Sequence, residues 1–239
     1  MKPTRPFRPC GFTLLETVIA IGVLAVLLTG FMYVFTPAAE GIRKSINVQQ
    51  ADRLASTLEQ ELVTLRQGQE SETITTGFDK AFEWIKSSDK PSDALLVYQY
   101  RGQTSSLRTD GTPSPEPTVK GKTAGTDYVV MSMMRRASDD YFEEDLTAIE
   151  GAVYLVKCTQ LVFDNDQLTT GKAGEITDSK GEGAAVSSAA TYPEAVIAFS
   201  ADFHLMPART SAYFSSSAFS SKFDELKTPV FTRNLAVRR

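Results

Sequence analysis

The hydrophobic residues of this chain are concentrated near its N-terminus. From Phe12 to Ala39 the only charged residue is Glu16, and residues 17–39 form an uncharged run rich in Val, Ile, Leu, Ala and Phe. These 23 residues extend for about 35 Å as a helix, enough to cross a hydrocarbon layer of about 30 Å. The run is too long for the apolar part of an ordinary signal peptide, and no small-residue cleavage site comes after it. We therefore predict a membrane-spanning helix over residues 12–36.

Beyond this run, apolar residues recur at a helical spacing. The stripe consists of Ile42, Ile46, Leu54, Leu58 and Leu62, with Ala51, Ala55 and Leu65 beside them. Polar residues occupy the positions between, so the pattern predicts an amphipathic continuation over residues 37–68 that packs against a folded domain. We expect a single helix from about Phe12 to Arg66, bent but not ended by Pro37, with a stop at Gln67-Gly68-Gln69.

The rest of the chain, residues 69–239, has the pattern of a β-rich globular domain. Strand-like runs lie at residues 94–100, 127–134, 152–163, 195–205 and 229–237, and residues 81–86 suit a short helix. Two stretches rich in Gly, Ser, Pro or Thr, residues 102–126 and 166–193, read as long exposed loops. The simplest architecture is an α+β fold, in which an antiparallel sheet packs on the second half of the N-terminal helix.

Composition and charge exclude several functional classes. The chain has 239 residues, of which 42% are hydrophobic, enough for a packed core. Its net charge of −4 gives no reason to expect nucleic-acid binding. Two cysteines and one histidine cannot form a four-cysteine zinc site or a two-histidine metal motif. We expect no cofactor, no metal and no enzymatic activity.

Two acidic segments of the globular part resemble metal-binding sequences only in part, and we do not expect either to bind a metal. Asp164-Asn165-Asp166 with Glu175 matches some positions of a calcium loop, but Leu168 and Thr169 replace an oxygen ligand and the required glycine. Asp139-Asp140 and Glu143-Glu144-Asp145 form an acidic run, which we interpret as a solvated surface.

Isolated nucleophiles and bases give no catalytic pattern either. His204 alternates with Phe203 and Leu205 in a strand-like run, which favours a structural role. The serines between Ser211 and Ser221 lack a nucleophile-elbow sequence. Cys158 lies among apolar residues and is expected to be buried.

The N-terminal border of the apolar run has two unusual features. Lys2, Arg5 and Arg8 precede the run, so the positive-inside rule keeps the N-terminus in the cytoplasm and exports the chain beyond Pro37. Glu16 lies inside the apolar segment, where a carboxylate costs on the order of 2.5 kcal/mol or more and needs a partner.

These features lie in the sequence Gly11-Phe12-Thr13-Leu14-Leu15-Glu16. The junction resembles the class III leader of type IV prepilins and type II secretion pseudopilins. The resemblance covers residues 1–66 and implies a pilin-like fold, with a basic leader at residues 1–11 and a membrane or filament-core helix at 12–36. It also implies cleavage after Gly11 by a prepilin peptidase in the bacterial inner membrane, followed by N-methylation of Phe12. Cys10 leaves with the leader.

The same resemblance implies an assembly role. In a filament, the Glu16 carboxylate of one subunit can pair with the Phe12 amine of its neighbour, and each charge relieves the burial of the other. Such a head-to-tail contact does not close and therefore produces an open helical assembly. The size of the exported part favours a minor subunit, similar to J-type pseudopilins and related minor pilins. The expected partners are the peptidase, other pilins or pseudopilins and the inner membrane, and the expected location is a single-pass membrane protein that enters a periplasmic or extracellular filament.

Two alternatives remain open on the sequence alone. A membrane-anchored ligand-binding or adhesin module can use the same export route, with its activity in the long loops. A plain signal-anchored ectodomain is the other alternative, and it predicts no cleavage at all.

Overall fold

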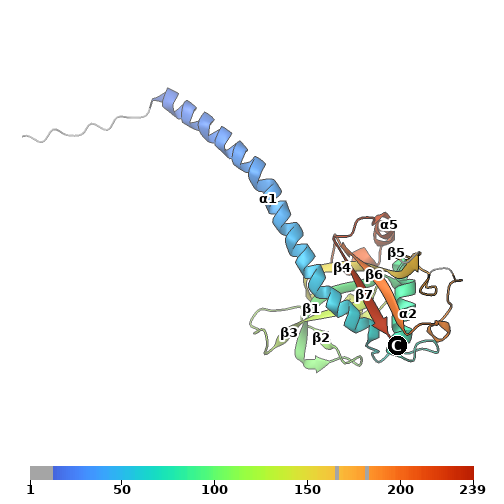
Figure 1. Ribbon diagram of the computed structural model, residues 1–239. Helices are drawn as coiled ribbons and strands as arrows, with labels where there is room; N and C mark the ends of the chain where they lie inside the picture. The colour runs from blue at the N-terminus through green and yellow to red at the C-terminus, as the bar shows by residue number, and fades with distance from the viewer. Residues whose placement is uncertain (1–12, 165–166, 181–182) are drawn as a thin grey trace, which may run out of the picture. The chain divides into compact units, whose positions relative to one another are not determined.

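The structure is a computed structural model that describes residues 13–164, 167–180 and 183–239. It is an α+β fold with a long N-terminal helix and an antiparallel sheet (Figure 1). The helices are α1 (Leu14–Val63), α2 (Gly77–Ser87), α3 (Asp140–Asp145), α4 (Ser211–Phe214) and α5 (Ser217–Glu225). The strands are β1 (Leu95–Leu107), β2 (Pro113–Pro115), β3 (Tyr128–Arg136), β4 (Ile149–Asp164), β5 (Gln167–Thr170), β6 (Val196–Leu205) and β7 (Phe231–Arg238).

Helix α1 confirms the expectation of one helix that continues through Pro37. The chain divides into two compact units, residues 1–46 and 47–239, and the helix belongs to both. In the second unit its buried stripe consists of Ala51, Leu54, Ala55, Leu58 and Leu62, as predicted. The predicted stripe began too early, because Ile42 and Ile46 are 62% and 56% exposed.

The helix ends at Val63, slightly before the predicted Arg66, and α2 packs against its last turn. The Cα of Gly77 lies so close to the Val63 carbonyl that a Cβ there would be 2.0 Å from the oxygen. The amine of Lys80, a fully buried side chain, donates hydrogen bonds to the carbonyls of Glu61 (2.8 Å) and Thr64 (2.6 Å). These carbonyls belong to the end of a helix, where acceptors lack intrahelical partners.

The sheet has the order β2-β1-β4-β6-β7, with β3 added to β1 and β5 added to β4. Every strand pairing is antiparallel. All five predicted strands are present, since their alternating or continuous apolar runs are strong signals. The predicted short helix at 81–86 is also present and starts earlier, at Gly77, because Thr76 and Asp79 form a capping box.

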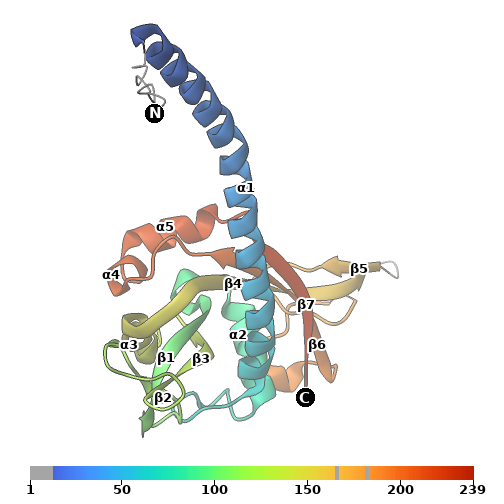
Figure 2. The same ribbon diagram turned by 90° about the vertical axis from the view of Figure 1, so that its left-hand side faces the viewer.

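Both faces of the sheet are covered (Figure 2). Alternate residues of β1 point to opposite faces, so Leu95 and Val97 pack with α1 and α2, whereas Leu96 and Tyr98 pack with Phe142 of α3 and residues of α5. The second layer, with α3, α4 and α5, was not anticipated from the sequence.

The two predicted loops are partly wrong. Within 102–126, β1 continues to Leu107 and pairs with β2, since Gly102 lies opposite Pro115 and a Cβ on Gly102 would meet Pro113 at 2.6 Å. Within 166–193, β5 forms a hairpin with the end of β4. Gly, Pro and Thr suggested loops by composition, but cross-strand pairing decides the local structure here.

Candidate functional site

The first candidate site is the N-terminal junction, of which the structure describes the part from Thr13 onward. Gly11 and Phe12 lie outside the described residues. Glu16 lies in the first turn of α1, where its Oε2 accepts hydrogen bonds from the Thr13 amide (2.8 Å) and hydroxyl (2.8 Å). In return, the Glu16 amide donates to the Thr13 hydroxyl at 3.2 Å.

This reciprocal pair is a capping box that begins α1. It satisfies amides that have no partner in the first turn of a helix. Sequence reasoning considered Glu16 alone and missed Thr13, although the pattern Thr-x-x-Glu before an apolar run is itself the signature of this cap. The cap leaves Oε1 of Glu16 without a hydrogen bond among the described residues.

Beyond this cap, the first half of α1 carries no charge as far as Ala39, and its apolar side chains are exposed on all sides. Its most apolar 18-residue window has a mean hydropathy of 2.5 and no buried residue, so by length and composition α1 can cross a membrane. Leu14, Val26 and Val34 are each at least 70% exposed. Such a surface is compatible with membrane anchoring of a chain whose folded domain lies C-terminal to the helix.

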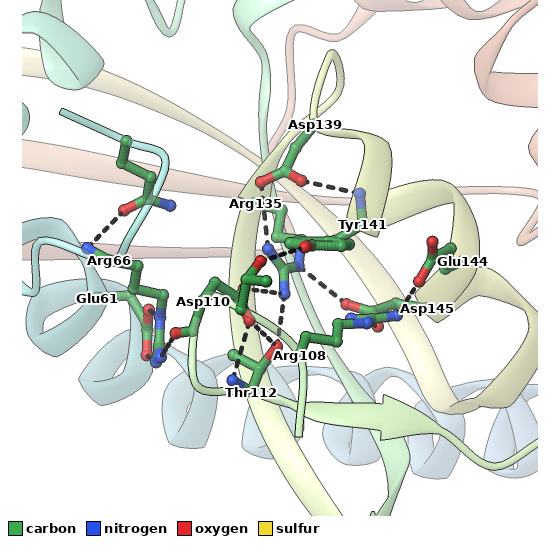
Figure 3. Close-up of polar contacts among 12 residues, drawn as sticks. Glu61, Arg66, Arg108, Asp110, Thr112, Arg135, Asp139, Tyr141, Glu144 and Asp145 are labelled. Atoms are coloured by element: carbon green, nitrogen blue, oxygen red, sulfur yellow. Dashed lines mark hydrogen bonds and ion pairs between the residues drawn. The ribbon is translucent and has the colours of Figure 1, made fainter. Parts of the chain in front are cut away.

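The second cluster of interest is a buried ionic network around Arg135, which sequence reasoning did not foresee (Figure 3). The Arg135 guanidinium donates to Asp110 (2.8 Å), Asp139 (3.2 Å) and Asp145 (3.0 Å). Asp145 also accepts from Arg108 and from the Tyr98 hydroxyl, each at 2.7 Å. These residues come from β1, β3, α3 and the loop before β2.

This network corrects the interpretation of the acidic run as a solvated surface. Asp140, Glu143 and Glu144 are exposed, but Asp145 is fully buried. Asp139 caps α3 by accepting from the Tyr141 amide and also binds Arg135. Glu144, although exposed, pairs with Arg108 at 2.8 Å. The run therefore divides into solvated and structural acids, because one turn of α3 directs Asp145 into the sheet.

The electrostatic balance of the network depends on Arg135. Burial raises the pKa of Asp145, although Arg135 and Arg108 act in the opposite direction. Burial acts the same way on Asp110, but hydrogen bonds from Thr112 and Arg135 outweigh it and place the Asp110 pKa below its usual range. Burial opposes the charge of Arg135, yet the surrounding acids raise its pKa. Each buried charge of this network is paired with an opposite charge, as in an ionic network that has a structural role.

The remaining candidate residues have structural surroundings. His204 is buried in β6 opposite Leu155, and its burial lowers its pKa. Cys158 is buried in β4, which confirms the prediction, and burial raises the pKa of its thiol to about 12. Ser211–Phe214 and Ser217–Glu225 are the short helices α4 and α5. Across the described ranges, no group of three or more His, Cys, Asp or Glu residues is placed to hold a metal ion.

Comparison with known protein families finds a match at the N-terminus. Residues 7–32 match the family described as the prokaryotic N-terminal methylation motif. The match includes Gly11, Phe12, Thr13 and Glu16, and it supports a prepilin-like, processed protein similar to pilins and pseudopilins. No curated protein and no solved structure matches the chain.

Proposed function

We propose that this chain is a structural subunit, a minor pseudopilin or minor type IV pilin, of a type II secretion or type IV pilus-like filament. It enters the bacterial inner membrane as a precursor with its C-terminal domain exported. A prepilin peptidase cleaves after Gly11 and methylates the new N-terminus at Phe12. The observation behind this proposal is the methylation motif at residues 7–32, which leads directly into a helix with exposed apolar side chains.

Glu16 then specifies the register of the filament. Its Oε2 is occupied by the Thr13 cap, whereas Oε1 accepts no hydrogen bond from a described residue and can bind the Phe12 amine of a neighbouring subunit. A subunit in the wrong register leaves the Glu16 carboxylate and the Phe12 amine unpaired in an apolar environment. The cost is roughly several kcal/mol for each ion. The cap holds the carboxylate in one orientation before the neighbour arrives, so Thr13 acts as a positioning residue.

The N-terminus of the mature protein tests this proposal. The chain is produced with and without a prepilin peptidase, and its N-terminal peptide is identified by mass spectrometry. With the peptidase, the expected first residue is methylated Phe12. An intact Met1 in the native host contradicts the proposal and favours a plain signal-anchored ectodomain.

Replacement of Glu16 by leucine separates processing from assembly. The expected result is normal cleavage and at least about tenfold less protein in sheared filaments, because an unpaired Phe12 amine in the filament core is unfavourable by more than about 1.4 kcal/mol. Quantitative immunoblotting of membrane and filament fractions measures both steps. Glu40→Leu is the matched control, since Glu40 is exposed on the same helix beyond the apolar run. Equal incorporation of both variants removes the pairing role.

A further inference from the structure

The outer edge of β3 is open. Among the described strands, β3 pairs with β1 alone, from Tyr128 to Arg136. Between Val129 and Arg135, no main-chain hydrogen bond to a described residue is formed outside that ladder. In an antiparallel pair every second residue directs its N–H and C=O away from the partner strand. A row of unpaired donors and acceptors therefore runs along this edge.

The chemistry of this edge differs from that of β7, the strand at the other end of the sheet (Figure 1). β7 contains Arg233 and Arg238, and charged side chains along an edge discourage the addition of another strand. From Tyr128 to Met134, β3 has no charge, proline or glycine, and Val130 is 49% exposed. An edge of this kind is a template for an added strand.

A groove of about 750 Å³ lies at the C-terminal end of this edge. Both Arg135 and Arg136 line it, although consecutive residues of a strand point to opposite faces. It is also lined by Trp84 of α2 and Tyr141 of α3, two helices that cover opposite faces of the sheet. The groove therefore surrounds the C-terminal end of β3, just beyond the uncharged stretch Tyr128–Met134, and the segment 67–71 contributes to its other wall. A strand added along that stretch would lead into it.

The groove has an excess of negative charge. Its two guanidiniums are already paired, Arg135 with three carboxylates and Arg136 with Asp93 at 3.4 Å. Glu70, Glu83 and Asp140 also line the groove, and within the described part of the chain none of the three forms an ion pair. A ligand with a basic side chain complements this charge.

We propose that an extended segment of a neighbouring subunit adds to the outer edge of β3 and places a Lys or Arg side chain in the acidic groove. Main-chain hydrogen bonds supply affinity and the groove supplies specificity for the basic residue. That the neighbour is a filament subunit rests on the proposed function, whereas the chemistry of the edge and the groove does not.

A peptide titration tests the edge and the groove directly. The probe is a short acetylated peptide of alternating valine and threonine that ends in arginine. The full chain in detergent micelles reports binding through Trp84, its only tryptophan, which lines the groove. We expect a saturable change in fluorescence. Affinity should fall at least about tenfold when glutamate replaces the arginine or when a central proline removes a main-chain donor.

Variants of the groove locate the binding site. Glu83→Gln combined with Asp140→Asn should weaken the arginine peptide about tenfold. Asp224→Asn combined with Glu225→Gln makes the same change of charge at exposed positions of α5 and should leave the affinity unchanged. No saturable binding, equal binding of the glutamate peptide, or an unchanged affinity of the groove variant overturns the proposal. The titration needs neither peptidase nor filament, so its failure is distinct from failure of the proposed function.

The identity of the neighbour needs an experiment in cells. A photo-crosslinking residue at Val130 should give a covalent product with a second protein that carries the same type of N-terminal methylation motif, identified by mass spectrometry. The product should disappear when the prepilin peptidase is absent. A product that persists without the peptidase, or whose partner lacks the motif, overturns the assignment to a filament subunit.

Discussion

Replacement of Arg135 by methionine is expected to lower the free energy of unfolding by about 3–5 kcal/mol, the usual cost of removing one partner from a buried ionic network. Arg135 is 1% exposed and binds the carboxylates of Asp110 and Asp145, which are 7% and 0% exposed. Methionine fills part of the volume but leaves both acids without this cation. Denaturant unfolding of the full chain in micelles, followed by Trp84 fluorescence, measures the loss.

The pH dependence of this loss identifies its cause. In the variant, Asp145 keeps Arg108 but loses Arg135, the strongest of the interactions that oppose its burial, so its raised pKa rises further and it becomes protonated on moderate acidification. The destabilisation should therefore be smaller at about pH 5 than at about pH 7. A protein whose carboxyl group has a raised pKa in the folded state loses stability as the pH rises through that pKa. Arg233→Met is the control, because the Arg233–Asp52 pair is largely exposed and such pairs contribute about 0–1 kcal/mol. A loss that is equally small in both variants, or independent of pH, contradicts the assignment.

The sequence predicts the framework of this fold well, for physical reasons. The strands β4 and β6 contain long apolar runs, and the stripe from Ala51 to Leu62 repeats with the helical period, so local pattern determines local structure. The prediction of a loop from Gly102 to Leu107 is wrong because these polar, small residues form a strand only when β2 and β3 are beside them.

The ionic network could not be predicted in the same way. Asp110 and Asp145 lie 25 and 10 residues from Arg135 in different elements, and each residue alone is typical of a surface residue. Their burial depends on how α3 and the loop before β2 pack on β1 and β3, which no local pattern encodes. The Thr13–Glu16 cap is the opposite case, since both partners lie within one helical turn and the pattern was available in the sequence.

The side chain of Lys80, a residue of α2, binds the end of α1 by hydrogen bonds. Its ammonium lies over the Trp84 ring at 4.3 Å and donates to the end of α1, where a positive charge also complements the helix dipole. Burial lowers the pKa of Lys80 from 10.5 to about 7. The charge of Glu61 raises this pKa, whereas the positive charges of Arg66, Arg135 and Arg136 lower it further. In the folded protein Lys80 therefore loses its proton near neutral pH.

This shift predicts a stability that increases with pH in the alkaline range. Between pH 7 and 10.5 the unfolded chain retains a proton on Lys80 that the folded chain has lost. The Lys80 contribution to the free energy of unfolding should then rise by up to about 1.4 kcal/mol per pH unit, reach its full value above the unfolded pKa, and be lost as the pH drops towards 7. From about pH 9 the raised pKa of the Cys158 thiol acts in the opposite direction, so the slope is measured between pH 7 and 9. Lys80→Met should remove this slope, whatever its effect at a single pH. Lys222→Met, which alters an exposed lysine of α5, should retain it. Unfolding curves at several pH values measure the slopes, and identical slopes in both variants would show that Lys80 does not titrate in this range.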